Sequence, residues 1–276
     1  MSPSQKITAD TIERYREDGV ICLRNVIDEK YLDLTGKGIV RNLTEPGRFF
    51  RDQTPADSPA RYVFDYWSWR SIPESTELIQ DSPIAEFVAE LLNARKLNLL
   101  MDNWFMREAG ATSGAPWHHD EPYFDFTGGN KCVFWFPLES VESTAGLTFL
   151  AGSHRWNKLF MPSNFRDKMP FDGDMSGYST IDSINFAATE HRMLSWNLEP
   201  GDCLIFDFRT LHVATTEEGA LPSTIHRMSL RYGDQDVRFT PRGDWTLETS
   251  EYLQSLGCQP GGSVDCDLLP QVWPRS

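Results

Sequence analysis

Residues 117–123 contain the side chains best suited to bind a metal ion. On a β-strand, side chains two positions apart point to the same side, so a strand here would direct His118 and Asp120 to one spot. His212, in a later apolar segment, offers a third ligand. Two histidines and one carboxylate leave open positions on an octahedral metal, the arrangement found in non-haem Fe(II) oxygenases. Together the three residues predict an iron site, whereas each of them alone would more often be structural.

Arg227, Ser229 and Arg231 form a second polar group, which would share one face of a predicted strand. A guanidinium that is buried without a partner is costly. A guanidinium group can donate two parallel N–H bonds to one carboxylate. If this face of the strand points inward, it would suit a dicarboxylate co-substrate, and the Ser229 hydroxyl could bond the same carboxylate. The alternative is that these arginines face solvent or pair with Asp234 and Asp236.

The first third of the chain is predicted to supply helices. Thr8 can cap a helix that Gly19 ends, and a short apolar strand follows at 20–23. A second helix is expected at 28–43, then an irregular loop at 44–60. The clearest helix begins at Ser82 and Pro83, and the helical spacing of its apolar residues over 84–92 requires a flat surface, such as a sheet, to pack on.

Short β-rich runs separated by turn residues make up the middle of the chain. They lie at 97–106, 117–126, 131–138, 147–150, 203–208 and 226–232. Helices first and strands afterwards predict an α+β, mainly β, fold with an antiparallel double sheet as its core. Residues 155–195 show neither period and are expected to be an insertion that covers the pocket, and the tail after about 240 is expected to be irregular.

Composition excludes several classes of function. The chain has 276 residues, enough for one domain with a sizeable core, and a net charge of −14, which argues against nucleic acid and anionic membrane surfaces as partners. Its five cysteines are unpaired in number and pattern, which indicates a reducing compartment and no disulfide framework. Neither an apolar leader nor a membrane-spanning run is present, so the expected location is the cytoplasm.

Six motifs in a fixed order resemble the phytanoyl-CoA dioxygenase family of Fe(II)/2-oxoglutarate oxygenases. They are 12–20 (IERYREDGV), 117–120 (WHHD), 133–138 (VFWFPL), 146–155 (GLTFLAGSHR), 199–212, which opens with EPGD, and 229–236 (SLRYGDQD). The resemblance implies a single domain over 1–276: a helical part at about 1–95, packed on the major sheet of a double-stranded β-helix (jelly-roll or cupin-like) core at about 96–240, and the tail. It also implies iron on His118, Asp120 and His212, and 2-oxoglutarate held through Arg227.

Two positions depart from the family pattern. His119 stands where family members often have Gln, and Ile225 stands where the family's arginine is commonly found. Arg227 is therefore our replacement for that arginine, with Arg231 as the second choice. Ser229, Trp135 and Arg107 complete the predicted 2-oxoglutarate contacts.

The resemblance implies that 2-oxoglutarate and O2 are co-substrates, and that a C–H bond of a small metabolite or natural-product intermediate is hydroxylated with release of succinate and CO2. An Asp at position 120, where related halogenases carry a small residue, favours hydroxylation over halogenation. Arg51, Arg61 and Arg70 would suit an anionic substrate. The alternative functions are a cupin-type binding module without catalysis and a non-oxidative metal enzyme. The oligomeric state and the substrate itself cannot be predicted from the sequence.

Overall fold

The computed structural model describes residues 6–112, 114–174, 176–214 and 220–275. Its longer helices are α2 (Ala9–Asp18), α3 (Glu29–Thr44), α4 (Pro73–Asp81), α5 (Ile84–Leu92) and α6 (Leu247–Ser255). Its strands are β1 (Val20–Leu23), β2 (Arg51–Asp52), β3 (Tyr62–Tyr66), β4 (Leu97–Arg107), β5 (Phe126–Thr127), β6 (Lys131–Pro137), β7 (Thr148–Leu150), β8 (Leu159–Phe160), β9 (Tyr178–Ser179), β10 (Met193–Leu194), β11 (Cys203–Asp207), β12 (His212–Val213), β13 (Ile225–Asp234), β14 (Arg238–Phe239) and β15 (Gln271–Trp273).

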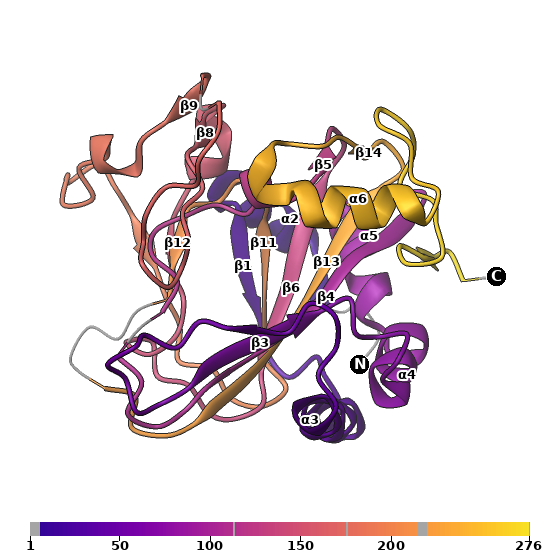
Figure 1. The fold of residues 1–276 in the computed structure, drawn as a ribbon, viewed down its shortest axis with the longest axis horizontal. Coiled ribbons are helices and arrows are strands. Elements are labelled where there is room, and N and C mark those ends of the chain that lie inside the picture. Colours follow the sequence, from indigo (N-terminus) through magenta and orange to yellow (C-terminus); the bar gives the residue numbers. More distant parts are fainter. Residues whose placement is uncertain (1–5, 113, 175, 215–219, 276) are drawn as a thin grey trace.

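A large sheet forms the centre of the molecule (Figure 1). Its strands follow the order β1-β11-β6-β13-β4-β3-β2, with β15 added beside β4. A smaller sheet, β10-β7-β12, packs against it, since the rings of Phe149 on β7 and Phe206 on β11 have centroids 5.0 Å apart. Two facing antiparallel sheets are the jelly-roll architecture, so the predicted fold class is confirmed.

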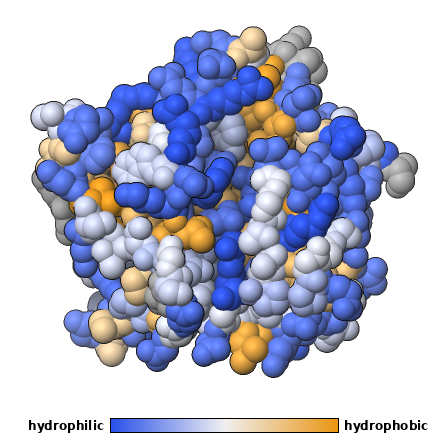
Figure 2. All heavy atoms as spheres, turned by 90° about the horizontal axis from the view of Figure 1, so that it is seen from above, coloured by the Kyte–Doolittle hydropathy of each residue, from blue (hydrophilic) through white to orange (hydrophobic). Residues whose placement is uncertain are grey.

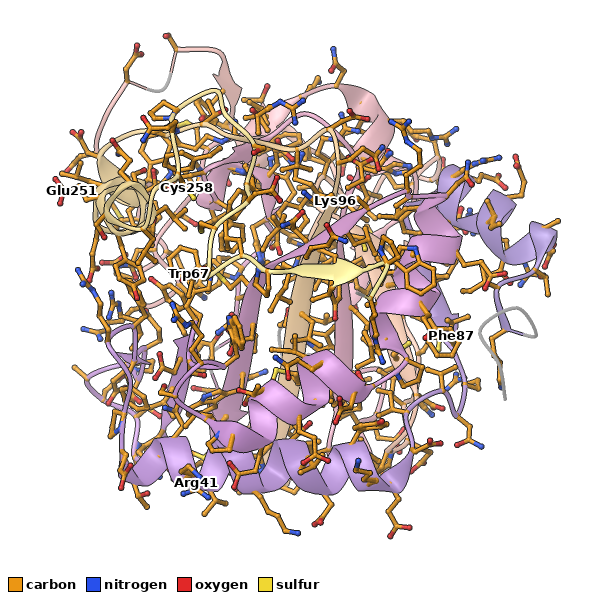
Figure 3. The ribbon with its side chains drawn as sticks, turned by 90° about the vertical axis from the view of Figure 1, so that its right-hand side faces the viewer. Arg41, Trp67, Phe87, Lys96, Glu251 and Cys258 are labelled. Atoms are coloured by element: carbon orange, nitrogen blue, oxygen red, sulfur yellow. The ribbon has the colours of Figure 1, made fainter. Side chains whose placement is uncertain are left out.

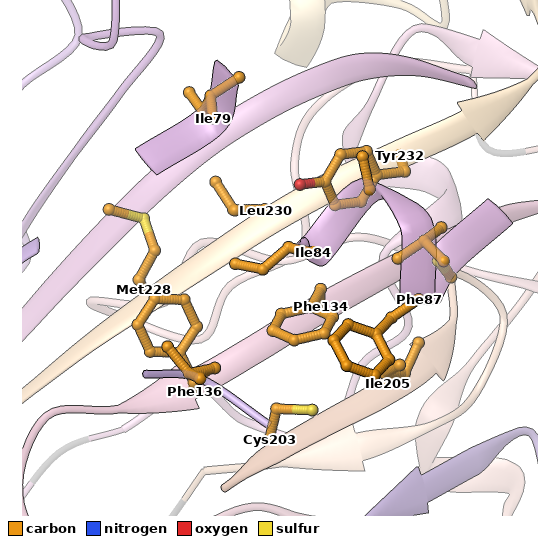
Figure 4. Packing of buried hydrophobic residues seen from close by; sticks show 14 of the residues in the cluster. Ile79, Ile84, Phe87, Phe134, Phe136, Cys203, Ile205, Met228, Leu230 and Tyr232 are labelled. Carbon is orange, nitrogen blue, oxygen red and sulfur yellow. The ribbon is translucent and has the colours of Figure 1, made fainter. Parts of the chain in front are cut away.

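The alternation of side chains along the central strands divides the core into two layers. Met228, Leu230 and Tyr232 of β13 point to one side and pack with residues of β6 and of helices α4 and α5 (Figure 4). The residues that alternate with them, Arg227, Ser229 and Arg231, therefore face the opposite side, toward the smaller sheet. Helices α2 to α5 thus cover one face of the sheet, and the other face is left for the site. Figure 3 shows α3, which carries Arg41, and α5, which carries Phe87, on this helical side.

The predicted elements before residue 93 are largely confirmed. The Thr8 hydroxyl accepts the N–H of Thr11 at the start of α2, and Gly19 ends the helix with a left-handed φ of 78°. A Cβ at Gly19 would meet the Nδ1 atom of His154 at 2.3 Å. Only glycine satisfies both requirements, so the turn from α2 into β1 depends on it.

Several predicted elements were wrong. Residues 117–126 do not form a strand: His118 makes an isolated bridge to His212, a 3-10 turn follows at Glu121–Tyr123, and only β5 is extended. The tail is not irregular, because it contains α6 and β15. β3 and α4 were not predicted from the sequence. These elements are short and are held by tertiary contacts more than by their own periodicity.

The exposed surface is mostly hydrophilic on the face seen in Figure 2, with hydrophobic atoms only in small groups. Among the described residues, none of the helices combines the length and the apolar character that crossing a membrane requires. Residues 1–5, which belong to the stretch expected to lack an apolar leader, lie outside the described structure.

Asp102 on β4 is expected to make the stability of this core dependent on pH. It is fully buried, and only its Oδ2 atom is bonded among the described residues, to the Ser68 hydroxyl at 3.1 Å. Burial raises the pKa of Asp102 to about 7. The unfolded chain releases this proton at about pH 4, whereas the folded protein keeps it up to about pH 7. The bound proton therefore stabilises the folded state below about pH 4. This stabilisation, about 4 kcal/mol in all, is lost as the pH rises from about 4 to about 7.

Asp102→Asn is expected to remove this dependence. Chemical denaturation at pH 5 and pH 8 should show the wild-type protein losing stability relative to the variant as the pH rises. An unchanged pH profile in the variant would contradict the assignment.

Candidate active site

Three side chains that can bind a metal meet where β12 pairs with residues 117–123, which we call the metal segment. One ligand atom from each of His118, Asp120 and His212 lies within 4.8 Å of the others, and all three residues are buried. The Asp120 Oδ1 atom is 3.6 Å from the Nε2 atom of His118 and 3.8 Å from that of His212. The backbone bridge between residues 118 and 212 brings the two histidines together. The predicted triad is therefore assembled, by a bridge and a turn and not by the strand that we expected.

Backbone carbonyls set the tautomer of both histidines. The Nδ1 atom of His118 lies 2.7 Å from the carbonyl oxygen of Pro116, and that of His212 lies 2.9 Å from the carbonyl oxygen of Thr210. Burial and then the nearby His212 lower the pKa of His118 to about 3, and burial lowers the pKa of His212 as well. Both rings are consequently neutral, donate from Nδ1 and leave the Nε2 lone pair for a metal.

Arg231 holds the second oxygen of the metal-site carboxylate. Its Nε donates to the Asp120 Oδ2 atom at 2.9 Å, and both side chains are buried. Burial alone would raise the pKa of Asp120, but Arg231 and the two histidines outweigh it, and the net pKa lies below its usual value. Asp120 is thereby kept ionised with Oδ1 free. The contact gives Arg231 a role at the metal site, and Arg231 also lines the cavity, so its predicted contact with 2-oxoglutarate stays a prediction.

Arg231→Met is expected to weaken the metal site by leaving Asp120 buried without its cation. Breaking one partner of a buried ion pair costs about 3 to 5 kcal/mol, so the unfolding free energy of the metal-free protein should fall by that order. Fe(II) affinity should also fall, because the carboxyl is then more easily protonated. Arg231→Lys should recover part of both losses, and equal stability of the wild-type and Met proteins would rule out this role.

Two buried arginines lie near the opposite end of β13. Arg227 donates to the carbonyl oxygen of Ala145 at 3.0 Å, but its Nε has no partner among the described residues. None of the three guanidinium nitrogens of Arg107 has one there either. Arg227 faces Phe105 across the β4–β13 pair, two positions from Arg107, so the two side chains are diagonal neighbours on one face. Burial, then the nearby Arg107, lowers the pKa of Arg227 to about 9.

These observations test whether iron and 2-oxoglutarate suit the site. Two neutral imidazoles and one ionised carboxylate are a donor set for a divalent iron ion with positions left open. Buried guanidinium groups with unused N–H donors are costly unless an anion binds them, and a carboxylate of 2-oxoglutarate is such an anion. The residues present therefore fit both groups.

The other predicted contacts of 2-oxoglutarate line a cavity that contains the triad. Trp135 is one of them, and the guanidinium carbon of Arg227 lies 5.5 Å from the centre of its ring. Ser229 and Arg107 also line it. His119, whose role was open, lines no part of it: its Nε2 accepts the N–H of Phe160 at 3.0 Å and so ties β8 to the metal segment.

A cavity of about 440 Å³ connects the triad with the arginine pair. Asn164, Phe165 and Phe171 contribute to its wall, so part of the insertion at 155–195 lines the cavity. The ring of Phe165 stands edge-on to that of His118 at 4.8 Å. An apolar ring beside a ligand histidine limits the space for water on this side of the triad.

No sequence pattern indicated the parts of the wall that come from β3, from α6, and from the residues that follow β2 or precede α6. They include Gln53, Tyr62, Tyr66, Trp245, Glu248 and Leu253. Arg51 lines the cavity, but it donates to Glu248 at 2.6 Å and is not a free cation. Arg61 is bonded to Glu108 and Arg70 is exposed, and neither lines the cavity. The weak apolar spacing of Leu253 and Leu256 was the only local signal of α6.

The jelly-roll fold with two histidines and an aspartate at one point defines the class of non-haem iron oxygenases that use 2-oxoglutarate. The model of the phytanoyl-CoA dioxygenase (PhyH) family matches residues 15–220, and the chain belongs to this family. Its metal is accordingly iron, and its co-substrates are 2-oxoglutarate and O2. Among curated protein sequences, none matches the chain.

Solved structures share the fold at low sequence identity. The carbocyclase SnoK from nogalamycin biosynthesis has a TM-score of 0.74 at 18% identity, over 99% of this chain and 98% of its own. The epimerase SnoN, in complex with Fe3+, alpha ketoglutarate and nogalamycin RO, has a TM-score of 0.74 at 18% identity, over 95% of this chain and 96% of its own. EctD from S. alaskensis, with 2-oxoglutarate and 5-hydroxyectoine, has a TM-score of 0.60 at 16% identity, over 84% and 77%.

Proposed function

We propose that this oxygenase hydroxylates an unactivated C–H bond of a small natural-product intermediate in the cytoplasm, with release of succinate and CO2. In this proposal His118, Asp120 and His212 hold the iron, and Arg227 binds the remote carboxylate of 2-oxoglutarate. One observation supports the proposal most strongly: a single cavity contains the converging triad and two buried arginines with unused N–H donors. A binding module without catalysis would not require a metal site and a co-substrate site together.

Each residue has a separate task in this proposal. Bound iron, supplied with 2-oxoglutarate and O2, provides the two-electron oxidation of the substrate C–H bond. Arg227 fixes the co-substrate through paired N–H donors, and Ser229 lies beside it on β13. Trp135 gives the guanidinium an aromatic face to lie against. Arg231 keeps Asp120 ionised and oriented, and Phe165 shields the metal side from water.

The substrate side of the cavity is predominantly aromatic. Tyr66, Tyr123, Phe165, Phe171 and Trp245 line it, and the Arg51 and Glu248 charges there neutralise each other. Such a wall favours a substrate with a ring system over a strongly charged one. SnoK comes from nogalamycin biosynthesis and the SnoN structure contains nogalamycin RO, which is consistent with a natural-product substrate here.

Anaerobic titration with Fe(II) and then 2-oxoglutarate tests the proposed site first. A visible absorption band that needs both components, and that is lost in His212→Ala, is expected. A substrate screen in which succinate is quantified by mass spectrometry then tests the reaction, with candidate ring-containing metabolites compared with no added substrate. Succinate formation that no candidate stimulates, together with no absorption band, would favour the non-oxidative or non-catalytic alternative.

A further inference from the structure

Two of the five cysteines lie in contact at the end of the cavity wall. The Sγ atoms of Cys258 and Cys266 are 3.2 Å apart, and all five thiols are free in this structure. Cys258 follows α6, and its N–H donates to the carbonyl oxygen of Leu253, a residue that lines the cavity. Figure 3 shows Cys258 near α6, the helix that carries Glu251. The pair belongs to neither the metal site nor the arginine pair.

The two thiols differ in accessibility and in acidity. Cys258 is buried within the core on the cavity side, whereas Cys266 is half-buried. A hydrogen bond from Cys258, and backbone bonds from Leu268 and Leu269, lower the pKa of Cys266 to about 6. The same contact raises the pKa of Cys258. Cys266 thus provides an accessible thiolate near neutral pH, with a protonated thiol directly behind it.

The segment that carries Cys266 is anchored to the large sheet. The Asn98 side chain on β4 donates to Asp265 at 3.1 Å and to the carbonyl oxygen of Leu269 at 2.7 Å. The indole N–H of Trp69 donates to the carbonyl oxygen of Leu268 at 3.2 Å. A covalent bond between the two cysteines would therefore fasten the end of α6, and with it one wall of the cavity, to the start of β4.

We propose that Cys258 and Cys266 are a site of reversible oxidation to an intramolecular disulfide that fastens this wall. With glutathione disulfide as the oxidant, the Cys266 thiolate attacks one of its sulfurs and releases a glutathione thiolate. The Cys258 thiol then loses its proton to solvent, attacks the Cys266 sulfur and displaces the second glutathione. Both protein thiols are oxidised, and one glutathione disulfide is reduced to two glutathiones.

Peptide mass mapping of the full chain after exposure to glutathione disulfide tests the proposal. Cleavage after Arg242 and Arg275 leaves both cysteines on one peptide. After the remaining thiols are blocked, that peptide should lack both blocking groups and be lighter than the reduced peptide by two hydrogens. The oxidised protein should melt higher by about 5 °C, and a reducing agent should reverse the shift.

Three variants serve as controls. Cys258→Ser should stop at a glutathione adduct on Cys266, and Cys266→Ser should leave Cys258 unmodified. Cys22 is also half-buried, but burial raises the pKa of its thiol to about 11, so Cys22→Ser should oxidise like the wild-type protein. The proposal is overturned if wild-type Cys258 and Cys266 both remain thiols, or if they form disulfides only between molecules. None of these readouts depends on turnover, so the proposed reaction and the oxidation site can fail separately.

Discussion

His212→Ala is expected to abolish stoichiometric Fe(II) binding and reduce turnover to background. The Nε2 atom of His212 is one of only three ligand atoms that converge among the described residues. The two that remain after its removal cannot hold the iron in the three-ligand arrangement that leaves positions open for co-substrates. Loss of a supporting partner alone typically costs about 10 to 100-fold in metal affinity or activity, so loss of a ligand should exceed about 100-fold. Fe(II) titration under anaerobic conditions measures the first effect, and succinate formation measures the second.

His154→Gln is the matched control for this prediction. His154 is also buried, but its Nε2 lies 3.2 Å from the carbonyl oxygen of Arg16, outside the cavity. This variant should keep both iron binding and turnover. Tight, stoichiometric Fe(II) binding by folded His212→Ala would remove His212 from the triad. Asp120→Gly supplies an independent test, since hydroxylation should again fall to background. This variant also leaves Arg231 buried without its carboxylate, so its free energy of unfolding should fall by about 3 to 5 kcal/mol.

Arg227→Ala is expected to weaken the apparent affinity for 2-oxoglutarate by about 30-fold or more. Truncating one partner of a buried, charge-assisted pair typically costs about 2 to 5 kcal/mol, and about 2 kcal/mol already corresponds to that factor. Because Arg227 does not contact the triad ligands, Fe(II) affinity should be nearly unchanged. The KM for 2-oxoglutarate and calorimetric binding of 2-oxoglutarate to the anaerobic iron-loaded protein report the change separately from the chemical step.

Arg227→Lys and Arg231→Ala distinguish this assignment from its rival. Lysine should restore only part of the affinity, because an ammonium cannot make the paired contact. Arg231→Ala should weaken iron binding as well, since Arg231 is bonded to Asp120. Arg231→Ala could instead weaken 2-oxoglutarate binding alone, while Arg227→Ala leaves that binding unchanged. The co-substrate would then bind to Arg231, four residues further along β13, and our assignment of Arg227 would be wrong.

Much of the fold could be predicted because it depends on local chemistry. The Thr8 cap, the Gly19 stop and the apolar spacing of α5 are each contained within a few residues. Alternation along β13 likewise placed Arg227, Ser229 and Arg231 on one face before any partner strand was known. Short elements such as β3, α4 and α6 were missed because neighbouring chain segments stabilise them more than their own pattern does.

By itself, the sequence determined which side chains are available for chemistry and, on β13, which of them share a strand face, since these follow from residue type and a period of two. Only the tertiary structure decided which of these side chains contact one another. The bridge from His118 to His212, the bond from Arg231 to Asp120 and the diagonal approach of Arg107 to Arg227 join segments far apart in the chain. Such contacts depend on strand register and on the burial of charge across the whole core, and no local pattern encodes them.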